Sequence, residues 1–340
     1  MKRILITGAA GFVGHHVVEH LLKNTDWELV LLDRLSYSSN GLDRLRDINV
    51  FEPMHDRVKM FTADFTKPIV DGLAQEIGQV DYILHMGAES HVDNSIKDPE
   101  PFVMSNVVGT MHVLNFARTQ THLSAFIYFS TDEVFGPAPE GVNYKEWDRF
   151  HSGNPYAATK AGGEELAVAY ANTYRIPTIV THTMNVFGER QHPEKFIPKV
   201  IRAVLNGETI QIHSNKEKTK AGSRYWIHAR NVGAALSYIL EGMETKWTWP
   251  ADFVDKFNIV GEAEVDNLTM ALSIASIVGK ELKYEMVDFH SSRPGHDLRY
   301  ALDGSKMTSL GWKLPIDFKE SLERTVKWTL DHPEWLNLKS

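Results

Sequence analysis

Cysteine is absent from all 340 positions of the sequence. Its absence excludes a disulfide framework, a thiolate zinc site and a cysteine nucleophile, and it suits a reducing compartment. The 16 histidines show no H-E-x-x-H or comparable spacing, so we expect no metal site. No run of about 18 apolar residues could span a membrane, and Thr7, Gly8 and Gly11 interrupt the apolar N-terminus that a signal peptide would need. We expect a soluble, cytoplasmic protein with no membrane partner.

Positive charge is also scarce, because 36 Lys and Arg residues stand against 44 Asp and Glu residues and leave a net charge of −8. Contacts to nucleic-acid phosphates need clustered Lys and Arg, so this balance argues against a nucleic-acid partner. The hydrophobic fraction of 43% permits a sizeable core. At roughly 150 residues per domain, the length indicates about two domains.

Short apolar runs alternate with helix-period segments in the first half of the chain. Continuous apolar runs are typical of strands buried on both faces, and their alternation with helices predicts an α/β fold with a doubly wound parallel sheet of Rossmann type. The predicted strands are Arg3–Thr7, Glu28–Asp33, Val58–Ala63, Tyr82–Met86, Ala125–Ser130 and Thr178–Thr181. The predicted helices are Phe12–Lys23, Val70–Gln75, Pro101–Arg118 and Pro155–Tyr174.

Beyond about residue 182 the pattern loosens, and prolines and glycines separate shorter elements. Two helices are still predicted there, Asn231–Gly242 and Asn267–Val278. We predict a first domain at 1–182, rejoined by about 224–250. Residues 183–223 and 251–340 are predicted to form a smaller, irregular α/β domain that closes over a ligand.

A glycine-rich loop follows the first predicted strand and opens the first predicted helix. Its residues are Gly8, Ala9, Ala10, Gly11, Phe12, Val13 and Gly14. Gly8 permits a tight turn, Gly11 lets the backbone approach a pyrophosphate, and Gly14 allows close packing of helix on strand. Asp33 ends the second strand about 20 residues later, where an acid binds an adenosine ribose and repels a 2′-phosphate. This favours NAD, although Arg34 beside it leaves NADP open.

Tyr156 and Lys160 stand four residues apart, on one face of a predicted helix. An ammonium beside a phenol stabilises the phenolate and lowers the pKa of the phenol, which makes a tyrosine usable as a base. Thr131, Asp132 and Glu133 follow the fifth predicted strand, where open α/β sheets bind their ligands. Two adjacent carboxylates raise each other's pKa, so the triplet is either catalytic or a solvated capping loop.

Together these motifs resemble those of the extended short-chain dehydrogenase/reductases, and among them the nucleotide-sugar 4,6-dehydratases of the dTDP-glucose type. The resemblance covers nearly the whole chain. The motifs that carry it are ITGAAGFVG (6–14), AESHVDNSI (88–96), NVVGT (106–110), STDEVFG (130–136), NPYAATKAGGE (154–164), HPEKFIP (192–198) and RPGHDLRYALD (293–303).

The resemblance implies an NAD-dependent lyase that acts on a nucleotide sugar. Tyr156 would take the proton of the sugar 4-hydroxyl as hydride passes from C4 to NAD, with Lys160 on the nicotinamide ribose and Thr131 on the sugar. Glu133 would then remove the C5 proton while Asp132 protonates the departing 6-hydroxyl. Return of hydride to C6 would give a 4-keto-6-deoxy sugar.

The resemblance also implies binding roles and a homodimer formed by the helices at 101–118 and 155–174. Asp64 matches an adenine contact, although a helix N-cap explains it equally well, and Asn106 matches a structural asparagine of the active site. Residues 1–182 would bind NAD, and the second domain the nucleotide sugar. The implied substrate contacts are Ser90, Asn185, Glu194, Lys195, Arg224, Asn258, Arg293 and His296.

Three stretches depart from the dTDP-glucose pattern: Asn185-Val186-Phe187-Gly188, the longer basic segment 214–223, and Met86-Gly87. The nucleotide and hexose therefore stay open. A nucleotide-sugar 4-epimerase, a uronate decarboxylase and a non-catalytic NAD-binding protein are the alternatives. The presence of both Asp132 and Glu133 favours dehydration, because β-elimination uses a base together with an acid.

Overall fold

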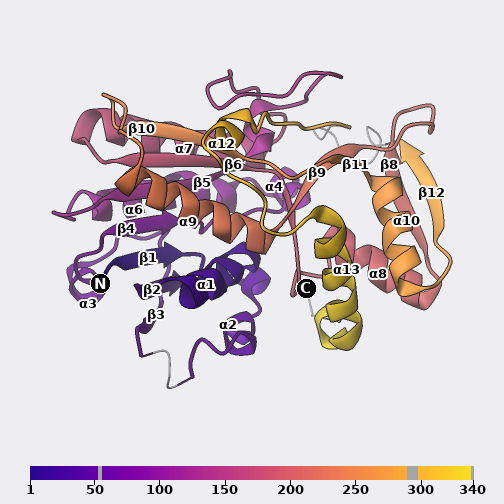
Figure 1. The fold of residues 1–340 in the computed structure, drawn as a ribbon, viewed down its shortest axis with the longest axis horizontal. Coiled ribbons are helices and arrows are strands. Elements are labelled where there is room, and N and C mark those ends of the chain that lie inside the picture. Colours follow the sequence, from indigo (N-terminus) through magenta and orange to yellow (C-terminus); the bar gives the residue numbers. More distant parts are fainter. Residues whose placement is uncertain (53–55, 289–297, 338–340) are drawn as a thin grey trace.

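A seven-stranded parallel sheet forms the centre of the computed structural model, which describes residues 1–52, 56–288 and 298–337. The strand order is β10-β6-β5-β4-β1-β2-β3, and the strands follow one another in this order from top to bottom in Figure 1. The doubly wound parallel sheet predicted from the sequence is therefore confirmed. Its strands are β1 (Arg3–Thr7), β2 (Glu28–Asp33), β3 (Val58–Thr62), β4 (Tyr82–His85), β5 (Ala125–Thr131), β6 (Thr178–Thr183) and β10 (Val254–Ile259).

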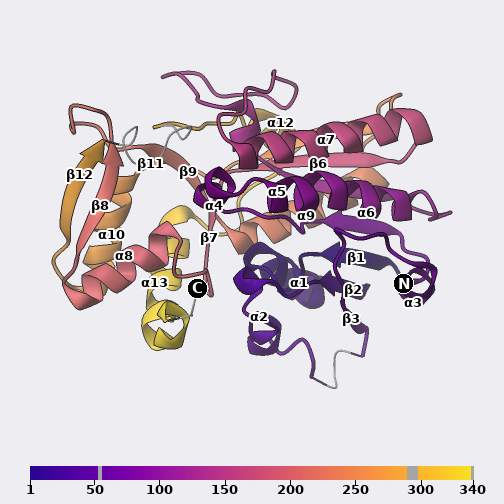
Figure 2. The same cartoon turned by 180° about the vertical axis from the view of Figure 1, so that it is seen from behind.

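Helices cover both faces of this sheet, and the strand residues alternate between the two layers. Ile4 and Ile6 of β1 belong to the core formed with α1 (Phe12–Asn24) and α9 (Ala229–Thr245). Leu5 points the other way, into the core formed with α6 (Thr110–Ala117) and α7 (Pro155–Tyr174). Figure 2 shows α6 and α7 lying side by side on that face. Burial on both faces explains why the strands are continuous apolar runs.

The segment predicted as one helix from Pro101 to Arg118 is divided in three. It consists of α5 (Glu100–Val103), a wider π-helical turn η3 (Met104–Gly109) and α6. Asn106 lies in that turn, and its side chain is bound to the backbone of Glu89 and to Thr159. π-turns of this kind occur frequently at functional sites.

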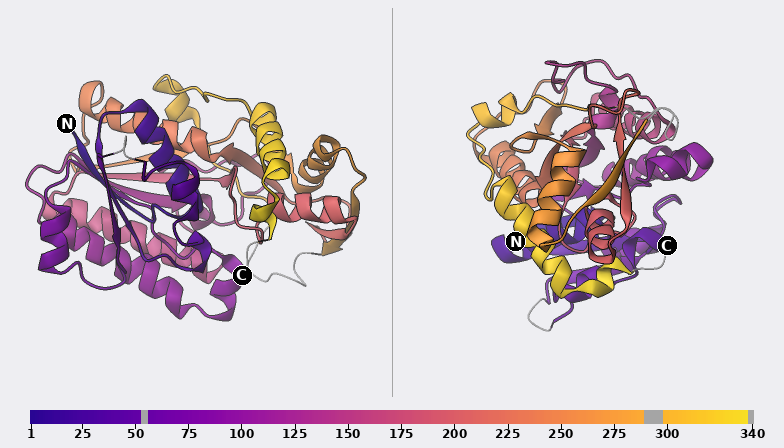
Figure 3. Two further views of the ribbon diagram at one scale, coloured as in Figure 1. Left: turned by 90° about the horizontal axis from the view of Figure 1, so that it is seen from below. Right: turned by 90° about the vertical axis from the view of Figure 1, so that its right-hand side faces the viewer.

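A smaller lobe lies at one end of the sheet (Figure 3). It has its own core, in which Val200, Ile212, Met270 and Val326 are buried together. The main elements of the lobe are β7 (Asn185–Phe187), α8 (Phe196–Asn206), β8 (Thr209–Ser214), β9 (Ser223–His228), β11 (Glu264–Asp266), α10 (Asn267–Val278), β12 (Lys283–Asp288) and α13 (Phe318–Asp331). Strands β11, β9 and β7 form one small sheet, and β12 pairs with β8 in another.

The remaining elements are short. They are η1 (Tyr37–Ser39), α2 (Asp43–Asp47), α3 (Asp71–Ile77), α4 (Val92–Lys97), η4 (Asp132–Phe135), α12 (Ser305–Ser309) and η5 (Pro333–Leu336). Among the helices of the described residues, none combines the length and apolar character that a membrane crossing demands.

Strand β10 marks a difference from the sequence-based division of the chain. Residues 254–259 pair with β6 in the central sheet, although the prediction placed them in the smaller domain. The cause is Lys256, a charged residue that interrupts the apolar run but is 3% exposed and paired within the core. Helix α9, which precedes β10, packs against α1 on the central sheet. The assignment of cofactor and sugar to the two parts stays a prediction.

Candidate active site

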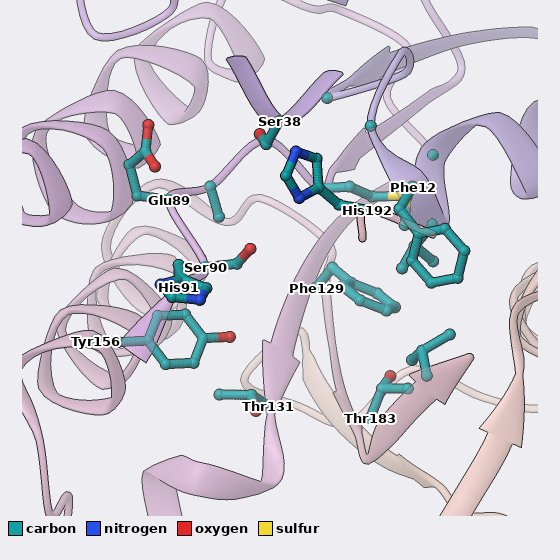
Figure 4. A pocket seen from close by; sticks show the side chains of 18 of the residues that line it. Phe12, Ser38, Glu89, Ser90, His91, Phe129, Thr131, Tyr156, Thr183 and His192 are labelled. Atoms are coloured by element: carbon teal, nitrogen blue, oxygen red, sulfur yellow. The ribbon is translucent and has the colours of Figure 1, made fainter. Parts of the chain in front are cut away.

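A cavity of about 430 Å³ lies at the carboxyl ends of the central strands, between the sheet and the smaller lobe. This is where open α/β sheets bind ligands. Figure 4 shows Tyr156 and Thr131 extending toward it, with Phe12 across the opening. Most of the predicted site residues line it: Gly8, Gly11, Phe12, Val13, Gly14, Asp33, Ser90, Thr131, Asp132, Glu133, Tyr156, Lys160, Asn185, Glu194 and Lys195.

The glycine loop packs too closely to admit side chains. Gly8 has a left-handed φ of +73°, and a Cβ on Gly14 would lie 2.1 Å from the carbonyl oxygen of Gly8. Gly11 is the N-cap of α1, and because it has no side chain it cannot bond to the first backbone amides of the helix. The first amides of α1 therefore face the cavity with a partial positive charge, as a pyrophosphate requires. A dinucleotide fits this cradle.

Asp33 stands at the end of β2 and holds the glycine loop as well as lining the cavity. Its Oδ2 accepts from the N–H of Ala10 at 3.0 Å, and its Oδ1 from the N–H of Leu35 at 2.8 Å. Burial raises the pKa of Asp33, while those two amide bonds oppose the rise. The neighbouring Arg34 pairs with Glu89, and its Nη1 lies 4.0 Å from Asp64.

Asp64 does not line the cavity and caps no helix in the described structure. Its Oδ1 accepts from the N–H of Thr66 at 3.0 Å, in the turn after β3. Its contact with Arg34 keeps it near the adenosine end of the predicted cofactor site. The role of Asp64 as an adenine contact stays a prediction.

The two predicted carboxyl groups sit in unlike surroundings on the 3-10 turn η4. Thr131 Oγ1 donates to Asp132 Oδ1 at 3.0 Å and accepts from the N–H of Glu133 at 3.4 Å. Asp132 is 4% exposed, and its Oδ2 has no hydrogen-bond partner among the described residues. Burial, followed by the charge of Glu133, raises the pKa of Asp132 to about 7. Asp132 can therefore carry a proton at neutral pH, as an acid must.

Tyr156 and Lys160 lie one turn apart on α7, with both side chains at the cavity. The ammonium of Lys160 donates to the carbonyl of Phe129 at 2.6 Å, and burial lowers its pKa to about 7. Burial and the charge of Glu133 raise the pKa of Tyr156 well above its ordinary value. The expectation that the neighbouring lysine lowers the pKa of this phenol is therefore wrong for the chain by itself, since burial and the nearby carboxylates determine it and the ammonium is bound to the carbonyl of Phe129.

The predicted substrate contacts divide into three groups. Ser90, Asn185, Glu194 and Lys195 line the cavity, and the charge of the buried Arg224 acts on Asp132 from just outside its lining. Asn258 is fully buried elsewhere. Its side chain is hydrogen-bonded to His182 and to the carbonyls of Tyr144 and Asp303, so it is not free to bind a substrate. Arg293 and His296 lie outside the described residues.

Several cavity residues were missed from the sequence. His192 Nδ1 lies 3.6 Å and His91 Nε2 3.9 Å from the carboxylate of Glu194, and the ring of Tyr37 packs edge-on against His192. These contacts join loops of the central sheet to the start of the smaller lobe. His91 and His192 are part of the AESHVD and HPEK motifs, so the signal was present. Trp226 on β9, which also lines the cavity, had no such signal.

A buried polar cluster supports the site from behind α7. Glu164, one turn beyond Lys160, accepts from Ser130 Oγ at 2.7 Å, from Lys256 Nζ at 2.7 Å and from His182 Nε2 at 3.1 Å. Its partners come from β5, β10 and β6, so the helix carrying Tyr156 is tied to three strands. Although burial opposes it, His182 and Lys256 hold the pKa of Glu164 at about 2.

The sheet, its glycine loop and the tyrosine-lysine helix at one cavity define a member of the extended short-chain dehydrogenase/reductases. The family model described as GDP-mannose 4,6 dehydratase matches residues 5–325, and the chain belongs to this family.

Relatives and solved structures agree over nearly the whole chain. The low-salt glycan biosynthesis protein Agl12 of Haloferax volcanii is 37% identical and covers 97% of this chain and 99% of its own length. A dTDP-glucose 4,6-dehydratase of Escherichia coli is 35% identical over 99% of this chain and 96% of its own. The crystal structure of DesIV, a dTDP-glucose 4,6-dehydratase from Streptomyces venezuelae with NAD and TYD bound, has a TM-score of 0.85 and 31% identity, covering 99% and 100% of the two chains.

Proposed function

We propose that this protein is a hydro-lyase that carries out the NAD-dependent 4,6-dehydration of a nucleotide-activated hexose. The observation that carries the proposal is the pair Asp132 and Glu133 at one cavity with Tyr156. Beside the hydride acceptor, oxidation at C4 needs one base, the tyrosine, whereas elimination across C5 and C6 needs a further acid and base. Burial leaves Asp132 with a pKa of about 7, which suits it to be the acid.

The residues of the chain divide the reaction between them. The Tyr156 oxygen takes the proton of the sugar 4-hydroxyl, held in place by Thr131. The 4-keto group acidifies the C5 proton, which the Glu133 carboxylate removes, so that the electrons of that bond form the C5–C6 double bond. The C6–O bond breaks, and Asp132 gives its proton to the departing hydroxyl, which leaves as water. Protonation at C5 then completes the 4-keto-6-deoxy sugar.

The glycine loop, Asp33 and Lys160 would hold NAD, which would supply the acceptor for the C4 hydride and its donor back to C6, and whose positively charged oxidised ring would favour the Tyr156 phenolate. That charge would oppose the raised pKa that burial gives to Tyr156. Arg34 is already paired with Glu89 and Asp64, which supports NAD over NADP, because a 2′-phosphate would have to compete with two carboxylates.

The substrate is tested with a panel of dTDP-glucose, UDP-glucose, UDP-N-acetylglucosamine, CDP-glucose and GDP-mannose. Each is incubated with the purified protein and NAD in heavy water and followed by mass spectrometry. Loss of one water with deuterium at C5 from one donor supports dehydration and identifies the nucleotide and hexose. Isomerisation without loss of mass indicates an epimerase, and carbon dioxide from added UDP-glucuronate a decarboxylase. No change in any donor, with NAD bound, indicates a non-catalytic protein.

We further propose a cytoplasmic homodimer formed through the helical segment 101–118, which contains the end of α5, η3 and α6, and through α7. The absence of cysteine suits the cytoplasm. Val103 and Tyr174, at the ends of this helical layer, are 43% and 45% exposed, which supports a covering partner. Sedimentation equilibrium of the protein, and of a variant with Val103→Glu, tests the assembly: a dimer that the charge dissociates is expected.

A further inference from the structure

Asn154 is the residue directly before α7, and the two ends of its amide bind different partners. Its Oδ1 accepts from the N–H of Ala157 at 2.9 Å, which caps the first turn of the helix. Its Nδ2 donates to Glu133 Oε2 at 2.9 Å. The residue is 6% exposed, so both bonds are largely shielded from water.

The orientation of this amide follows from its partners. A backbone N–H can only donate, so it must face the carbonyl oxygen, and the carboxylate of Glu133 then receives the nitrogen. Serine, threonine and aspartate cap helices as well as asparagine does. Of these residues, asparagine alone offers an N–H donor beside the capping oxygen.

We infer that Asn154 is a positioning residue for the elimination step, which fixes the carboxylate of Glu133 relative to the helix that carries Tyr156. The inference rests on the function proposed above. In that reaction Tyr156 and Glu133 must reach groups on adjacent carbons, C4 and C5, of one sugar. Tyr156 lies two residues beyond Asn154, so a single side chain sets the spacing of the two bases. The amide donor also stabilises the charged form of Glu133, which a base requires.

The test is Asn154→Asp, a nearly isosteric change that keeps the helix cap and places a carboxylate oxygen against Glu133. The main readout is deuterium uptake at C5 of dTDP-4-keto-6-deoxyglucose, or of the product of whichever donor reacts, in heavy water with the holoenzyme. This exchange needs the base alone, without oxidation or loss of water. We expect it to be about 10- to 100-fold slower, the cost of misplacing a catalytic group by about 1 Å. Repulsion between the two carboxylates should also lower the thermal unfolding midpoint, so the Asp317→Ala control is needed to separate the loss of exchange from the loss of stability.

A second readout separates oxidation at C4 from the later elimination of water. During turnover of the donor by Asn154→Asp, the near-ultraviolet absorbance of the reduced cofactor should persist, because oxidation proceeds and elimination lags. Asn154→Ala, which removes both bonds, should lower the unfolding midpoint as well. Asp317→Ala is the matched control: Asp317 caps α13 by accepting from the N–H of Glu320 at 2.8 Å, so its loss should lower the midpoint and leave C5 exchange unchanged.

The inference is overturned if Asn154→Asp exchanges C5 and turns over at the wild-type rate. It is overturned equally if oxidation and exchange fall together only in Asn154→Ala, because the residue would then be a helix cap and nothing more. Failure of the wild-type protein to dehydrate any donor would overturn the proposed function and this inference with it. Normal dehydration by both the wild-type protein and Asn154→Asp would overturn this inference and leave the proposed function standing.

Discussion

Replacing Lys256 with methionine should destabilise the protein through a carboxylate more than 90 positions away in the sequence. Lys256 Nζ lies 2.7 Å from Glu164 Oε1, and the two side chains are 4% and 0% exposed. The ammonium also lies 4.4 Å from the ring centre of Trp147. Methionine fills a similar volume but leaves Glu164 with His182 and Ser130 as its partners among the described residues.

The size of the effect follows from the pKa of Glu164. His182 and, after it, Lys256 hold that pKa at about 2, against an ordinary value of 4.5, so the carboxylate with both partners contributes about 3 kcal/mol of stability, of which Lys256 supplies a part. Loss of one partner of a buried pair costs about 3–5 kcal/mol in other proteins. We therefore expect Lys256→Met to lower the free energy of unfolding by about 3 kcal/mol at neutral pH.

The assay is urea unfolding at two pH values. Because the pKa of Glu164 is depressed in the folded state, its contribution is complete above about pH 4.5 and is lost as the pH falls toward about 2. The difference between wild type and Lys256→Met should accordingly be smaller at about pH 3 than at about pH 7. The double variant Glu164→Gln, Lys256→Met should be less destabilised than Lys256→Met, because no uncompensated charge remains. A cost below about 1 kcal/mol, or a cost equal at both pH values, would refute this account.

Three further outcomes are expected. Since Asp132 has a pKa of about 7 and must be protonated to act, kcat should fall as the pH rises through about 7. Asp132→Asn should lower kcat about 100-fold or more and remove this fall at high pH. The dependence of kcat on pH, measured for both proteins, checks this. Gly14→Ala should abolish NAD binding measured by calorimetry, because the added Cβ would meet the Gly8 carbonyl. Gly72→Ala is the control, since a Cβ at this position on α3 would lie in open space. It should bind NAD normally and gain up to about 1 kcal/mol in the free energy of unfolding by urea. Tyr156→Phe should leave NAD affinity within about twofold while C4 oxidation, followed by near-ultraviolet absorbance, slows at least 100-fold.

The ends of the elements were predictable where local chemistry decides them. Helix α7 begins at Pro155 as predicted, because proline suits the first turn and Asn154 caps it. Strand β10 was not recognised, because Lys256 reads as a surface residue unless its partner, 92 positions away in sequence, is known. The predicted helix at 101–118 contains a π-turn, and in it Asn106 is bonded to Glu89 and Thr159, which are contacts that no local pattern reveals.

The candidate site shows the same division between local and tertiary information. The residues of the glycine loop and of the Thr131–Glu133 triplet were identified from their order along the chain, and the cavity brings them together. Their protonation was not predictable in the same way. The sequence suggested that mutual repulsion of two carboxylates keeps one of them protonated, whereas burial is the larger cause for Asp132. Burial depends on tertiary packing, which no local motif encodes.

Asp132 and Glu133 are adjacent on one turn, yet one must act as an acid and the other as a base. Their surroundings beyond this turn must therefore differ. Asp132 obtains one hydrogen bond, from its neighbour Thr131, and is buried, so its neutral form is favoured. Glu133 points to the start of α7 and receives the amide of Asn154, which favours its charged form. The helix that supplies Tyr156 for oxidation thus also distinguishes the base from the acid of the elimination. It follows that a change at the start of α7 should affect oxidation and elimination separately, and that one at Glu164, which anchors the whole helix, should affect both together.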